Sequence, residues 1–299
     1  MNSCFSKSRE MVRYCRYRAY LLAVAFIVSG GCIREDLSDC RYLTLKFKVS
    51  DSREETNAGT DTVGNVHVYL FDSRGYVRTV EVDDISKHYT LGFEKSDEIS
   101  IAAWGNLRSD SIEIPGMHRG MCRLCAILKL KKQDEYCPEP PDLFFASYRS
   151  EDTVVDTVIV TLERIVSSVT ITGKHLSDSF GTDTVGCYFV IRGTTDGIDF
   201  NGETVGSEAA YRPPAYFDTE HNLKTPVFKI LPQAENEYLT IELYRGNEKL
   251  YSTHTDSEGE LLRALPGEQL NIVIDFSRRN VVIKIIITPW GETWQETVM

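Results

Sequence analysis

The sequence contains none of the short motifs that mark common enzyme active sites. It has no His-Glu-x-x-His, no Gly-x-Ser-x-Gly, no phosphate-binding P-loop and no Gly-x-Gly-x-x-Gly. Its six histidines are scattered along the chain, and its carboxylates are too numerous for any pair to be singled out as a glycosidase pair. We therefore expect no catalytic residues, no enzyme activity and no bound cofactor.

Positive charge is also scarce. The chain has 33 Lys and Arg residues against 44 Asp and Glu residues, a formal net charge of −11. Such acidity argues against a charge-driven complex with nucleic acid or with anionic lipid, because both need clustered basic residues. We expect no nucleic-acid partner.

No apolar run is long enough to span a membrane, and one short apolar run lies near the start of the chain. The segment 20–28 is apolar, follows a basic stretch and is too short to span a membrane, which takes about 20 apolar residues. It ends in Ser29-Gly30-Gly31-Cys32, which resembles the lipobox of bacterial lipoproteins, although Ser29 stands where leucine is usual. We predict a signal peptide over 1–31 and a lipid on Cys32. An ordinary signal peptide and an uncleaved anchor are the alternatives.

The next residues predict a lipidated tether over 32–42. Arg34, Glu35 and Asp36 follow the lipid cysteine directly, and this pattern resembles the surface-export signal of Bacteroidetes lipoproteins. We expect the protein to be attached to the outer membrane through its N-terminal lipid and to face the exterior. The alternative is that this acidic stretch is only a solvated linker.

Convincing 3.6-residue periodicity is missing from every segment longer than two turns, and short alternating strands fill the rest of the chain. Many short strands separated by turn residues at 8–12-residue spacing are typical of β-sandwiches. The strand pattern predicts an all-β chain with two tandem sandwiches, over 43–164 and 165–299, and a boundary near Arg164. The expected strands include 66–71, 76–82, 123–130, 165–172 and 281–287.

Cysteines are few, and five follow Cys32, which is an odd number: Cys40, Cys122, Cys125, Cys137 and Cys187. In an oxidising envelope one or two disulfides and a spare thiol are expected from them. A zinc site of His118 with three of these cysteines is an alternative. It is disfavoured because a strand over 123–130 would send Cys122 and Cys125 to opposite faces.

The last strand is apolar on both faces. Alternation places Val281, Ile283, Ile285 and Ile287 on one face, and Pro289-Trp290 ends the strand. A strand of this kind is normally central in a sandwich, which is one interpretation. The other is that this strand, with Trp290 and the tail after it, contacts a neighbouring subunit and completes that subunit's sheet.

Four parts of the sequence resemble the FimB/Mfa-type fimbrial anchor lipoproteins of Bacteroidales. They are the block from Gly31 to Cys40 with the strand after it, VYLFD at 68–72, AWGN at 103–106 and LERIV at 162–166. The resemblance implies two transthyretin-like Greek-key sandwiches at the base of a type V pilus. It also implies that the protein limits fimbrial length and binds the major fimbrial shaft subunit by β-strand complementation. The alternatives are a surface lipoprotein that binds glycans or host protein without polymerising, and a secreted hydrolase.

Overall fold

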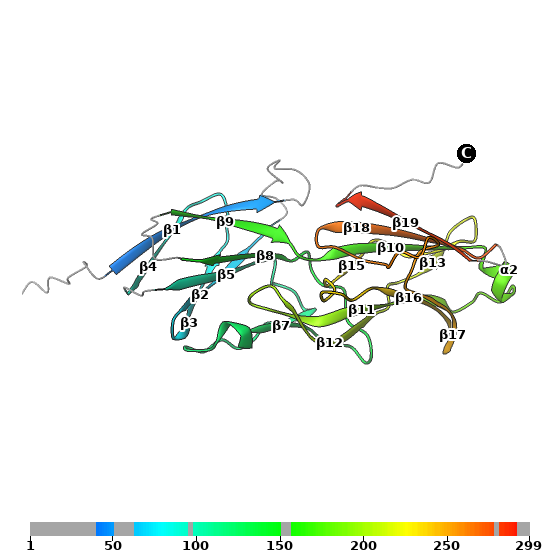
Figure 1. Ribbon diagram of the computed structural model, residues 1–299, viewed down its shortest axis with the longest axis horizontal. Coiled ribbons are helices and arrows are strands. Elements are labelled where there is room, and N and C mark those ends of the chain that lie inside the picture. The colour runs from blue at the N-terminus through cyan, green and yellow to red at the C-terminus, as the bar shows by residue number, and fades with distance from the viewer. Residues whose placement is uncertain (1–39, 51–62, 95–97, 151–156, 278–280, 292–299) are drawn as a thin grey trace, which may run out of the picture. The chain divides into compact units, whose positions relative to one another are not determined.

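The computed structural model describes residues 40–50, 63–94, 98–150, 157–277 and 281–291 (Figure 1). Residues 1–41 and 42–299 form separate units, and the sheets lie almost wholly in the second. The described chain is nearly all β, with one 3-10 helix, η3 (Arg123–Cys125), and one α-helix, α2 (Leu176–Phe180). This confirms the predicted all-β class. In this part of the chain, no helix combines the length and the apolar composition that crossing a bilayer requires.

The first sheet has seven strands from the N-terminal half of the chain, in the order β3-β2-β5-β8-β9-β1-β4. Strands β1 and β9 run parallel, so the chain crosses over to bring them together. The strands are β1 (Cys40–Ser50), β2 (Val66–Asp72), β3 (Gly75–Val82), β4 (Tyr89–Glu94), β5 (Ile99–Gly105), β8 (Phe144–Arg149) and β9 (Thr157–Arg164).

Two further sheets are built mainly from the C-terminal half. One has the order β13-β14-β10-β18-β19, with β15 also paired to β10. It contains β10 (Ser167–Lys174), β13 (Tyr216–Phe217), β14 (Leu223–Lys224), β15 (Phe228–Ile230), β18 (Glu268–Asp275) and β19 (Val282–Pro289). The other has the order β17-β16-β11-β7-β6, with β12 also paired to β11. It contains β6 (Ile112–Glu113), β7 (Ile127–Leu130), β11 (Cys187–Asp199), β12 (Thr204–Tyr211), β16 (Thr240–Arg245) and β17 (Glu248–Thr253).

Strand β2 shows how the first sheet contributes to two hydrophobic clusters. Val66, Val68 and Leu70 belong to a cluster to which all seven strands of this sheet contribute, so the sheet curves around it. Tyr69 and Phe71 point to the opposite face by alternation and belong to the second cluster. That cluster continues between the two C-terminal sheets. Strand β2 is therefore buried on both faces.

Phe200, in the turn after β11, joins the first sheet to the second cluster. Its ring centroid lies 4.6 Å from that of Tyr69, 5.7 Å from that of Trp104 and 6.4 Å from that of Phe71. All four side chains are buried. Such angled aromatic contacts add stability beyond that of the buried area.

The segment 123–130 departs from the predicted single strand. Residues 123–125 form the turn η3, closed by hydrogen bonds from Cys125 N to Cys122 O and from Ala126 N to Arg123 O, and β7 begins only at Ile127. The Arg123 Nε atom also donates to Phe200 O at 2.6 Å, which fixes the turn against the chain after β11. Local hydrogen bonds of this kind replace a strand ladder that the apolar pattern alone suggested.

Strand β7 also departs from its expected place in the chain. It pairs with β11, with Leu128 opposite Ile198, and β6 pairs with β7. A segment assigned to the sandwich over 43–164 therefore belongs to a sheet of the C-terminal half. The boundary near Arg164 stays a prediction, although β9 ends at Arg164 and β10 begins at Ser167.

Candidate functional site at the C-terminal edge strand

Strand β19 is the end strand of its sheet in the described chain. It pairs antiparallel with β18 along its whole length, from Glu268 opposite Pro289 to Asp275 opposite Val282, and no other described strand pairs with it. Figure 1 shows β19 in red beside β18. The interpretation of this segment as a central strand is therefore wrong. Apolar residues on both faces did not predict the position in the sheet.

The face of β19 that points to the core is only partly covered. Ile283 is buried, and Val281 and Ile285 pack against the second cluster. Ile287 is opposite the fully buried Leu270, and cross-strand partners lie on the same face of a sheet. Ile287 is nevertheless 47% exposed. This inward-facing residue near the end of the strand therefore lies beyond the cover that the described chain provides.

The outer edge of β19 is closed at one end and open at the other. Ile283 N donates to Ser257 Oγ at 2.6 Å, and Ser257 N donates to Ile283 O at 3.2 Å. Ile283 therefore turns its backbone groups away from β18, and by the antiparallel pattern Ile285 and Ile287 do the same. Among the described residues nothing bonds to those two backbone positions. The open edge thus runs from Ile285 to Ile287 and ends at Pro289, which has no N–H.

Trp290 fastens the end of β19 to the last residue of β9. The Arg164 guanidinium lies 4.3 Å from the Trp290 ring centroid and 4.8 Å from that of Phe144. Asp142 accepts two hydrogen bonds from this guanidinium, at 2.7 and 3.2 Å. The Arg164 side chain is only 5% exposed, so its charge needs both the carboxylate and the rings. The open edge is therefore held in a defined place.

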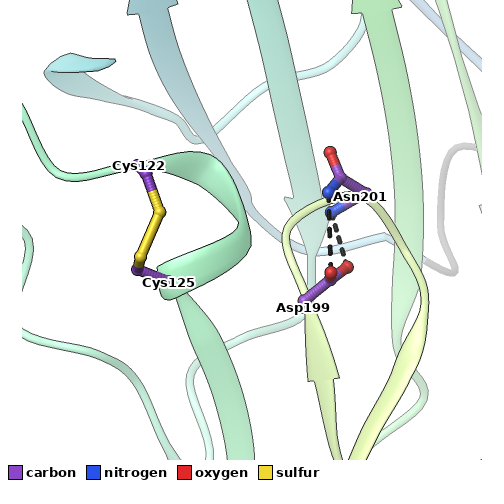
Figure 2. The surroundings of a disulfide bond; sticks show 4 residues. All are labelled: Cys122, Cys125, Asp199 and Asn201. Carbon is purple, nitrogen blue, oxygen red and sulfur yellow. Dashed lines mark hydrogen bonds between the residues drawn. A yellow bond between two sulfur atoms is a disulfide. The ribbon is translucent and has the colours of Figure 1, made fainter. Parts of the chain in front are cut away.

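Two of the candidate disulfide cysteines are bonded to each other. Figure 2 shows the Cys122–Cys125 disulfide at the turn η3, beside the chain that carries Asp199 and Asn201. The turn brings the two Cα atoms to 5.2 Å, so the prediction that these cysteines lie on opposite faces is wrong.

The other cysteines have different surroundings. Cys137 is buried and Cys187 half-buried, both without a disulfide, and burial raises the pKa of each thiol. Cys40 begins β1. In the described ranges no three His, Cys, Asp or Glu side chains are grouped as metal ligands.

Cys32 and the export residues Arg34, Glu35 and Asp36 lie outside the described residues. Of the predicted contact residues, Val281, Ile283, Ile285 and Trp290 contact the protein's own core, and only Ile287 is left largely exposed. Sequence reasoning missed Ser257, because nothing in an acidic turn indicates a contact 26 residues away. It also missed the pair Asp142–Arg164, although a lone arginine between two β-branched runs was a usable signal.

The comparisons with known proteins agree with one another. The major fimbrium anchoring subunit FimB of Porphyromonas gingivalis is 24% identical over 299 residues, covering 93% of this chain and 97% of that protein. Among solved structures, the fimbrial anchor protein Mfa2 of P. gingivalis superposes with a TM-score of 0.65 at 16% identity, covering 84% of this chain and 98% of that one. A putative adhesin from Bacteroides ovatus gives 0.64 at 15% identity, covering 84% and 95%.

At these identities the superpositions establish the shared fold. The family profile reaches further, because it matches residues 37–296, a range that includes every described strand. This chain belongs to the family of fimbrillin-A associated anchor proteins Mfa1 and Mfa2.

Proposed function

We propose that this chain anchors a fimbria at the cell surface and binds the shaft subunit through the open edge of β19. The membership of the anchor family and the likeness to anchoring subunits support the anchoring role. We call the contact between β19 and the shaft subunit the joint. It is supported by one observation: the backbone positions of Ile285 and Ile287 are unbonded among the described residues, and the core-facing side chain of Ile287 is half exposed. An added strand would bond to the backbone there and cover Ile287.

The membrane attachment in this proposal rests on the sequence. A lipid on Cys32 holds the N-terminus in the outer membrane, and Arg34, Glu35 and Asp36 direct the protein to the outer surface. Two or three acyl chains suffice for a firm attachment, at about 0.8 kcal/mol for each buried methylene. Cys32→Ala should lose the label of a fatty-acid analogue and leave the membrane fraction. Equal labelling of variant and parent would contradict the lipid.

The anchoring role is tested in cells that lack this protein. We expect their fimbriae to be released into the medium and to be longer than those of the parent, because nothing holds the base or ends the growth of the shaft. Electron microscopy of the cells and the medium measures both effects. Fimbriae that stay attached at normal length would contradict the proposal.

The joint at β19 is tested by two matched substitutions. Ile287→Lys places a charge where the added strand would pack, and Val282→Lys places it on the same strand next to the end that Ser257 closes. The two residues are similarly exposed, at 47% and 40%, so both variants should fold. We expect shed fimbriae for Ile287→Lys and retained fimbriae for Val282→Lys. Equal retention in both variants would place the joint elsewhere.

A further inference from the structure

A hollow of about 440 Å³ lies where β2 ends, over the face of the first sheet that carries Phe71. Its floor is a row of cross-strand neighbours, Phe71 on β2, Ser100 on β5 and Arg149 on β8. The turn η3 and Asn201 form its walls. Serine is a small residue, so Ser100 leaves room above the sheet. The volume of the hollow is within the range of about 300–1,000 Å³ that is usual for ligand pockets.

Three arginines line this hollow in a chain whose net charge is −11. Arg74 is bound by Asp72, with Nη2 2.9 Å from Oδ2, and Arg149 is bound at the rim by Glu98 at 3.3 Å. Arg123 is different, because its hydrogen bonds go to neutral acceptors. It donates to Phe200 O at 2.6 Å and to Ser147 Oγ at 2.7 Å.

The positive charge of Arg123 is therefore not balanced by a bound carboxylate among the described residues. The pKa of Arg123 is lowered to about 10, mainly by burial and also by the nearby charge of Arg149, with Asp199 opposing the change. The two guanidinium groups line the same hollow and repel each other. An anion between them would offset this repulsion and accept hydrogen bonds from the remaining N–H groups of both.

We propose that this hollow binds an acidic sugar, with the carboxylate between Arg123 and Arg149. The other polar groups suit the hydroxyl groups of a sugar ring, because Ser73, Ser100 and Asn201 also line the hollow. Figure 2 shows the nitrogen atoms of Asn201 directed to Asp199 and its side-chain oxygen pointing away. That oxygen is an acceptor for a ligand hydroxyl.

A peptide is the other class of ligand with carboxylates, and the surroundings of the hollow disfavour it. Strand addition needs a free sheet edge. The start of β3, which borders the hollow at Gly75, is already bonded: Tyr76 N donates to Met121 O at 2.8 Å and Gly120 N donates to Tyr76 O at 2.9 Å. The hollow thus suits a compact ligand.

Binding of glucuronic acid, N-acetylneuraminic acid and glucose to the folded protein tests the proposal by calorimetry or ligand-observed NMR. We expect saturable binding of at least one sugar acid and at least tenfold weaker binding of glucose, which lacks the carboxylate. Arg149→Gln should weaken the sugar acid about tenfold. Arg108→Gln removes an exposed arginine elsewhere, bound to Glu81, and should leave binding unchanged. Ser100→Leu fills the floor of the hollow without changing its charge and should abolish binding.

Three outcomes would overturn the proposal. One is the absence of saturable binding by both sugar acids, and another is unchanged binding in folded Arg149→Gln and Ser100→Leu. The third is a triglutamate peptide that binds as tightly as the sugar acids, because the hollow would then recognise carboxylates of peptides. This test does not depend on the fimbrial role, since all its measurements use the isolated protein.

Discussion

Strands β2 and β19 have similar apolar patterns but different positions in their sheets, because β2 is an inner strand and β19 an end strand. Both carry apolar residues on both faces, and a sequence pattern alone treats them alike. Strand β2 lies between β3 and β5, whereas β19 is paired only with β18 in the described chain. The difference is in what covers the second face of each strand.

The chain itself covers β2 on both sides. The first cluster lies against Val68 and its neighbours, and Phe200 with the turn η3 covers Tyr69 and Phe71. Strand β19 has the second cluster on one side, where Ile287 near the end of the strand stays exposed, and Val282 on the other side is exposed as well. Apolarity on both faces therefore predicts that both faces are covered in the working protein. It does not say whether the cover is part of the same chain.

The largest effect is expected from removing the cover of β2. Phe200→Ala should lower the free energy of unfolding by about 3–5 kcal/mol, because a fully buried aromatic ring is lost and leaves a cavity between three other rings. Urea unfolding measures this change. Phe217→Ala, at a 38% exposed phenylalanine of β13, is the control and should cost less than about 1 kcal/mol. Equal losses would mean that Phe200 does not hold the two regions together.

A smaller effect is expected from opening the turn η3. The Cys122–Cys125 disulfide closes a loop of four residues, for which the chain-entropy relation gives about 2 kcal/mol. The double substitution Cys122→Ser, Cys125→Ser should lose about that much, and a reductant should bring the parent to the same value. Cys187→Ser, at a free cysteine, is the control. A parent protein whose unfolding is insensitive to reductant would refute this contribution.

Trp290→Ala should cost about 1–2 kcal/mol, because the buried Arg164 loses one of the two rings that contact its guanidinium. Trp290→Phe keeps an aromatic ring and should lose less. Thermal unfolding of the three proteins compares them. A loss as large as that of Phe200→Ala would show that the end of β19 belongs to the core and is not a separate contact.

The sequence predicted local structure better than position. The residues Asp72-Ser73-Arg74-Gly75 are typical of a turn and lie between β2 and β3, where Gly75 has the φ of 109° that such a turn requires. Gly246-Asn247, a pair of residues typical of hairpin turns, likewise lies between β16 and β17. Both depend on a few neighbouring residues, whose conformational preferences are local.

The features that the sequence missed depend on distant partners. The turn η3 is fixed by Phe200 O, which is 77 residues from Arg123, and the open edge of β19 is defined by the absence of a second neighbour among the described strands. The hollow exists because Ser100 faces the same side as Phe71, and this follows from the register of β2 and β5. No local pattern contains this information.

The smallest expected effects are on the protection of single backbone amides, which hydrogen exchange measures. The amides of His67 and Tyr69 lie in β2, between two paired strands, and should exchange only when the whole protein unfolds. The amides of Ile285 and Ile287 face the open edge and should exchange orders of magnitude faster, whereas that of Ile283 is slowed by its bond to Ser257. Addition of the shaft subunit should slow Ile285 and Ile287 and leave Ile283 unchanged, because a strand added at this edge bonds to the first two alone. If Ile285 and Ile287 in the free protein are as slow as Tyr69, another part of the chain already covers this edge. The joint with the shaft would then have to lie on a different strand.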